Sequence, residues 1–107
     1  MNISKQAERL GLEPGQYREL LQLFVENTRM ELKEIKQAIR ENDFKKAADL
    51  VHSFKGAAAN LGIDDIAARG EALGHAVKNR QSGIEQTINK VQNDVERLSQ
   101  TFRKTRP

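Results

Sequence analysis

Residues 84–102, near the end of the chain, read IEQTINKVQNDVERLSQTF and give the strongest signal for the fold. Their apolar residues recur at alternating steps of four and three: Ile84, Ile88, Val91, Val95, Leu98 and Phe102. An α-helix brings residues at these steps onto one face, which packs as a seam against neighbouring helices. The stretch therefore predicts a long amphipathic helix over about 84–104 within a helical bundle.

The preceding sequence predicts three more bundle helices, over about 14–42, 44–61 and 64–80. The first begins near Pro14, a favourable first-turn residue. Its apolar stripe is Tyr17, Leu20, Leu21, Phe24, Val25, Thr28, Leu32, Ile35 and Ile39. The Asn42-Asp43 pair caps the second helix, which ends at Leu61 because Gly62 terminates it. The third is capped by Asp64 or Asp65, with Ile66, Gly70, Leu73 and Val77 facing inward.

A short helix over about 3–10, ended by Gly11, completes the expected elements. Four long helices with short connections pack as antiparallel neighbours. The predicted fold is all-α: an antiparallel up-down-up-down four-helix bundle with a short extra N-terminal helix, in one domain over residues 1–107.

Composition excludes several classes of site. The chain of 107 residues contains no cysteine, which removes disulfides, thiol catalysis and thiolate zinc sites. Neither a signal peptide nor a membrane span is apparent, so we expect a cytoplasmic protein that does not associate with membranes. The net charge of +3 is far below that of a typical nucleic-acid-binding surface.

His52 is the candidate functional residue of the helix over 44–61. At ~100° per residue, Ala47, Leu50, Val51, Phe54, Ala57, Ala58 and Leu61 fall on the core side of that helix. His52 falls on the opposite side and faces solvent. We call its neighbours there the His52 face: Lys45, Ala48, Asp49, Lys55, Gly56, Ala59 and Asn60.

The His52 face is unusually bare for a solvated helix surface. Gly56 stands one turn after His52, where a mid-helix glycine costs ~1 kcal/mol relative to alanine and no turn explains it. Close approach by a partner would explain it. Lys55 lies where its ammonium can reach an anion on the imidazole, and Lys45 adds to that field. An exposed imidazole is a nucleophile at neutral pH without a general base.

The segment Val51-His52-Ser53-Phe54-Lys55-Gly56-Ala57-Ala58-Ala59-Asn60-Leu61-Gly62 resembles the signature of histidine-containing phosphotransfer (HPt) domains. This signature has a histidine, two residues, Lys-Gly, four mostly small residues and Leu-Gly. The resemblance implies that His52 is phosphorylated, that Lys55 stabilises the phosphoryl group and that Gly56 makes room for a receiver domain. A Leu-Glu pair common in the family's next helix appears here as Leu73-Gly74, so one surface carboxylate is missing.

The resemblance implies a phosphorelay intermediate of two-component signalling. On this resemblance, His52 is expected to accept a phosphoryl group from a receiver-domain aspartate of a response regulator or hybrid histidine kinase and to pass it to another receiver. The chain is then a carrier without ATP binding or kinase activity, and it is expected to be a monomer. No cofactor or metal ligand is predicted, and Mg²⁺ is expected in the receiver.

Two other functions remain open from the sequence. The chain could be a non-catalytic helical interaction or adaptor bundle in which His52 is incidental. Nucleic-acid binding through the basic residues 103–106 is a weaker alternative. His75, the second histidine, is predicted to be a solvated surface residue. The donor, the acceptor, and whether the chain is free-standing or part of a hybrid kinase stay undetermined.

Overall fold

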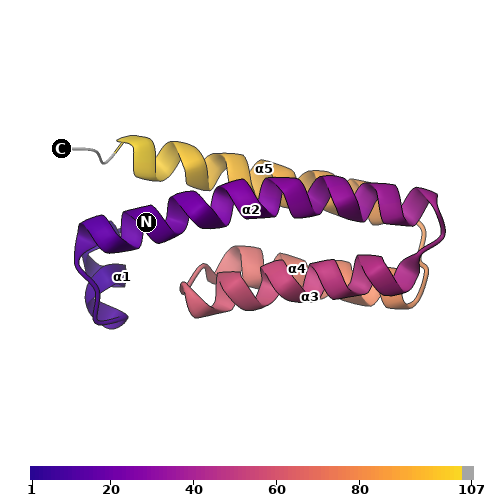
Figure 1. Cartoon of the computed structure of the whole chain (residues 1–107), viewed down its shortest axis with the longest axis horizontal. Helices are drawn as coiled ribbons and strands as arrows, with labels where there is room; N and C mark the ends of the chain where they lie inside the picture. Colours follow the sequence, from indigo (N-terminus) through magenta and orange to yellow (C-terminus); the bar gives the residue numbers. More distant parts are fainter. Residues whose placement is uncertain (105–107) are drawn as a thin grey trace.

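The computed structural model describes residues 1–104, and these form five α-helices without a β-strand (Figure 1). The helices are α1 (Ile3–Arg9), α2 (Pro14–Arg40), α3 (Phe44–Asn60), α4 (Asp64–Lys78) and α5 (Ile84–Lys104). The predicted all-α class is confirmed. Thr105 and Arg106 of the basic tail lie outside the described residues.

The four long helices pack around one core. The helix α3 packs against α2 and α4, while α5 packs against the other sides of α2 and α4. Figure 1 shows the α2–α3 and α4–α5 connections at one end of the molecule and the α3–α4 connection at the other. The short α1 packs on α2 at the end that holds the α3–α4 connection.

Left-handed residues end two helices slightly earlier than the sequence predicts. The helix α2 ends at Arg40 because Asn42 adopts a φ of 58°, and α4 ends at Lys78 because Arg80 adopts a φ of 49°. A residue in this region cannot continue a right-handed helix. The predicted cap of α3 is present, since the Asp43 carboxylate accepts a hydrogen bond from the backbone N–H of Lys46 at 3.1 Å.

The predicted cap of α4 is wrong. The N-cap residue is Ile63, which has no capping side chain. Asp64 and Asp65 instead occupy the first turn, where Asp65 accepts a hydrogen bond from the backbone N–H of Ile66 at 3.0 Å. Their negative charges there still favour the helix, because the N-terminal end of the helix dipole is positive.

The core contains every predicted apolar residue of α5 and the four predicted inward residues of α4. The other two long helices bury narrower faces than predicted. On α2, Leu20 is 38% exposed and Ile39 is half-buried, while Ala38 is buried. On α3, Ala57 is exposed and Leu50 and Leu61 are only half-buried. The buried residues of α3 are Ala47, Val51, Phe54 and Ala58.

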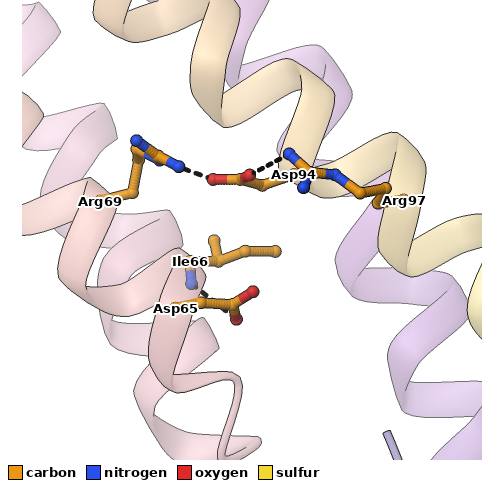
Figure 2. A network of polar contacts seen from close by, with 5 residues as sticks. All are labelled: Asp65, Ile66, Arg69, Asp94 and Arg97. Atoms are coloured by element: carbon orange, nitrogen blue, oxygen red, sulfur yellow. Dashed lines mark hydrogen bonds and ion pairs between the residues drawn. The ribbon is translucent and has the colours of Figure 1, made fainter.

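A buried carboxylate joins α4 to α5. The side chain of Asp94 on α5 is 6% exposed and lies between two guanidinium groups (Figure 2). It accepts a hydrogen bond from Arg69 of α4 at 2.7 Å and another from Arg97 at 2.9 Å. Because a buried charge is tolerated only when it is paired, this cluster fixes α4 against α5.

None of the helices in residues 1–104 is both long and apolar enough to cross a bilayer.

Candidate functional site

His52 lies in the middle of α3 and is exposed. Its outward direction follows from the four buried residues Ala47, Val51, Phe54 and Ala58, which recur at steps of four, three and four and fix the opposite face on the core. Burying a large apolar side chain such as Phe54 stabilises the fold by ~1.5–3 kcal/mol. The buried face therefore fixes the rotation of α3 about its axis. Turning His52 inward would expose these apolar side chains, and no contact of a surface residue could offset that loss.

A groove of about 470 Å³ runs between α3 and α4 beside His52. We call it the α3–α4 groove. Lys45, Ala48, His52 and Lys55 line it from α3, and Gly70, Glu71, Gly74, His75 and Lys78 line it from α4. Two imidazoles and several cationic side chains thus share one open groove.

Gly70 sets how closely α4 approaches α3 at this groove. A Cβ atom added to Gly70 would lie 3.1 Å from Cε1 of Phe54 and 3.2 Å from Cβ of Lys55. These separations are too short for comfortable packing, so a larger residue would push the helices apart. The contact fixes the base of the Lys55 side chain, which is half-buried, on the groove wall.

Gly56 and Gly74 have no such packing reason. A Cβ atom at Gly56 would meet nothing within 4 Å, and one at Gly74 would only touch Cγ1 of Val51 at 3.6 Å, an ordinary contact. The fold itself therefore tolerates alanine at both positions. The bare surface beside His52 is available to a partner molecule.

The other residues of the His52 face lie on either side of His52 along α3: Lys45, Ala48 and Asp49 precede it, and Ala59 and Asn60 follow it. Lys45 and Asp49, both exposed, form an ion pair at 3.1 Å along the helix, so the charge of Lys45 is partly compensated before any anion arrives. Ala48 is half-buried on the groove wall. Ala59 and Asn60 are exposed near the end of α3.

Side chains of α1 and α2 hold the C-terminal end of α3 by hydrogen bonds. The hydroxyl of Tyr17 donates a hydrogen bond to the Leu61 carbonyl at 2.6 Å, and the Gln6 side-chain amide donates to the Gly62 carbonyl at 3.0 Å. Burial raises the pKa of the Tyr17 hydroxyl above its ordinary value. These two bonds satisfy backbone carbonyls at the helix end that would otherwise lack a partner.

The α4 side of the site was missed by sequence reasoning. His75 is exposed, as predicted, but it also lines the α3–α4 groove together with Lys78. The signal in the sequence was the pair Gly70 and Gly74, spaced by one helical turn and followed at once by the histidine. The pattern alone could not show that this turn of α4 lies opposite His52.

The site offers an exposed nucleophile and cationic side chains. Within residues 1–104, no three histidine, aspartate or glutamate side chains gather in a cluster that could hold a metal ion. In the same part of the chain, neither the His52 nor the Lys55 side chain is engaged in a hydrogen bond or ion pair. Both side chains are therefore available to a ligand.

Comparison with protein families gives one finding. The family model described as the Hpt domain matches residues 19–101, which is most of the chain and includes all of α3 and α4. No curated protein and no solved structure matches the chain.

Proposed function

The chain belongs to the Hpt domain family, and from that premise we propose that it is a phosphorelay intermediate whose phosphoryl acceptor is His52. Hpt domains act in phosphotransfer within two-component signalling and interact with receiver domains. The observation that carries the proposal is the exposed His52 on the α3–α4 groove, with the unpaired Lys55 on the same wall. His52 would take a phosphoryl group from the aspartate of one receiver and pass it to another.

The transfer requires only a nucleophile, charge neutralisation and correct placement. The unprotonated imidazole nitrogen of His52 attacks the phosphorus of the receiver's aspartyl phosphate. A nitrogen–phosphorus bond forms while the bond between phosphorus and the carboxylate oxygen breaks, and the free carboxylate is released. The ammonium of Lys55 stabilises the negative oxygens of the phosphoryl group. Transfer to the next receiver runs these steps in reverse.

The receiver is expected to dock on the His52 face, where Gly56, Ala59 and Asn60 leave room and Lys45, Ala48 and Asp49 form the border. Such a relay contact would be transient and small, below ~1,200 Å². The receiver is expected to supply Mg²⁺ and its acidic pocket. The carrier itself would be a monomeric, antiparallel up-down-up-down bundle without kinase activity, an order supported by helix connections at alternate ends of the molecule.

The test is receiver-dependent phosphate uptake by the wild-type protein and by His52→Gln. The wild-type protein should acquire an acid-labile, base-stable phosphate that maps to His52, and the variant should acquire none. The two proteins should unfold at the same temperature, because the His52 side chain is exposed. Uptake by His52→Gln at the wild-type level would refute the proposal.

The alternative of a non-catalytic adaptor bundle gives a different result. An adaptor would bind its partner equally well with and without His52 and would carry no phosphate. The family match and the unpaired cation beside His52 favour the carrier.

A further inference from the structure

A second histidine–lysine pair lies across the α3–α4 groove from the first. On α3, Lys55 follows His52 by three residues, and on α4, Lys78 follows His75 by three residues. Residues three apart in a helix share a face. All four side chains line the same groove, so each wall carries one imidazole and one ammonium from these pairs, and Lys45 adds a second ammonium on the α3 wall.

The other cationic side chains of the groove already have a contact within the chain, and a single carboxylate faces the cations. Lys45 is paired with Asp49 at 3.1 Å, and the Arg80 guanidinium lies 4.9 Å from the ring centre of Phe44. Glu71 is the one carboxylate among the residues that line the groove. Within residues 1–104, the side chains of His75 and Lys78 make no hydrogen bond or ion pair. The α4 wall therefore presents cationic and hydrogen-bonding groups without a partner from the chain.

Gly74 keeps this wall accessible from α3. A Cβ atom there would touch only Val51. Val51 is a buried residue and directly precedes His52 in the sequence. Since packing does not require a glycine, its effect is to leave the space between the His52 and His75 walls unobstructed. An anion attached to His52 could thus be approached from both helices.

We propose that His75 and Lys78 form, with Lys55, an anion-binding wall that holds the phosphoryl group carried by His52. The inference rests on the proposed function and assigns α4 a direct part in it. The negative charge of the phosphoryl group is shared by three oxygens that point in different directions. The Lys55 ammonium can contact only those that face α3. Donors from α4 would stabilise the charged state and slow the attack of water on phosphorus.

The experiment measures how long the phosphate stays on His52. The protein is loaded with phosphoramidate, in which the bond between phosphorus and ammonia breaks as the bond to the imidazole forms, so no receiver is needed. After removal of the donor, loss of phosphate from His52 is followed by peptide mapping. The variants are His75→Gln, Lys78→Gln and Lys78→Arg, with Lys46→Gln as the control, an exposed α3 lysine that does not line the groove.

His75→Gln and Lys78→Gln are expected to lose the phosphate about twofold to fivefold faster than wild type, the size of one solvent-exposed charge contact. Lys78→Arg should restore the wild-type rate, because it keeps the charge, and Lys46→Gln should match wild type. Unchanged thermal unfolding of all variants would exclude a structural cause, since these side chains are exposed.

Equal phosphate lifetimes in Lys78→Gln, His75→Gln and wild type would overturn the inference. Phosphate that accumulates on His75 in preference to His52 would also overturn it, because His75 would then be an acceptor rather than a ligand. These failures differ from failure of the proposed function, in which phosphorylated receivers transfer nothing to His52 even though phosphoramidate loads it.

Discussion

At the scale of single residues, Gly56 is a position where the fold would accept alanine and where docking of a partner is expected to require glycine. An added Cβ atom would meet nothing within 4 Å, so alanine fits the helix without a clash. Alanine also restricts the unfolded chain more than glycine does, and it favours a helix interior by about 0.5–1 kcal/mol. A glycine kept here lowers stability without any compensating contact inside the molecule.

Gly56→Ala should therefore stabilise the protein and impair phosphate transfer. The free energy of unfolding should rise by about 0.5–1 kcal/mol in urea titrations, and transfer from a phosphorylated receiver should slow because the added methyl group obstructs docking. Gly70→Ala is the matched control, since its Cβ would press on Phe54 and Lys55 and should destabilise the protein. If Gly56→Ala left receiver transfer unchanged, the clearance role of Gly56 would be wrong.

Tyr17 makes the stability of the α3 end depend on alkaline pH. Burial raises the pKa of its hydroxyl in the folded protein above the ordinary value of 10.0. In the unfolded chain the hydroxyl loses its proton first, and this lowers the free energy of the unfolded state. The contribution of Tyr17 is therefore complete below about pH 10 and is lost as pH rises through the higher folded pKa.

Tyr17→Phe should lower the free energy of unfolding by about 0.5–1.5 kcal/mol at neutral pH, because the Leu61 carbonyl loses its hydrogen-bond donor. The gap between wild type and the variant should narrow above pH 10. Urea titrations of both proteins from pH 7 to pH 11 measure this gap. A gap that widened in alkali would contradict the direction of the pKa shift.

At the scale of helices, one side chain defines the beginning of α3. Asp43 accepts a hydrogen bond from the Lys46 N–H at 3.1 Å. Asp43→Ala should therefore lower the free energy of unfolding by about 1 kcal/mol, whereas Asp43→Asn or Asp43→Ser, which can also cap, should lose much less. Circular dichroism during urea titration gives the comparison. Equal losses for alanine and serine would show that the cap contributes little.

Local chemistry explains why α3 and the position of His52 were predictable. Asp43 and Gly62 are strong boundary residues, and the apolar steps between them fix which face is buried. The end of α4 was harder, because a left-handed arginine has no sequence signature comparable to glycine. The prediction of the α4 cap was wrong for a related reason: Asp64 and Asp65 are both residue types that can cap a helix, but neither occupies the N-cap position.

The α4 wall of the site could not be derived from the pattern of either helix. Which turn of α4 lies opposite His52 depends on the packing of Gly70 against Phe54 and Lys55, and this is a contact between helices rather than a periodicity. His75 was correctly predicted as exposed. Its place on the α3–α4 groove follows only from that contact.

At the scale of the whole molecule, α4 carries half of the groove and must be held in place from its other side. Asp94 provides that hold, because its buried carboxylate accepts hydrogen bonds from Arg69 of α4 and from Arg97 (Figure 2). Arg69 immediately precedes Gly70, the residue that contacts α3. A single turn of α4 is thus fixed against α5 and against α3.

Asp94→Ala should lower the free energy of unfolding by about 1–3 kcal/mol, because two guanidinium groups lose their common acceptor. Glu96→Ala is the matched control: Glu96 pairs with Arg29 at 2.6 Å but is 53% exposed, so its loss should cost below about 1 kcal/mol. Hydrogen exchange should also quicken in α4 of Asp94→Ala, and more than in α2. An effect no larger than that of Glu96→Ala would mean that apolar packing alone holds α4. The groove beside His52 would then not depend on the buried carboxylate.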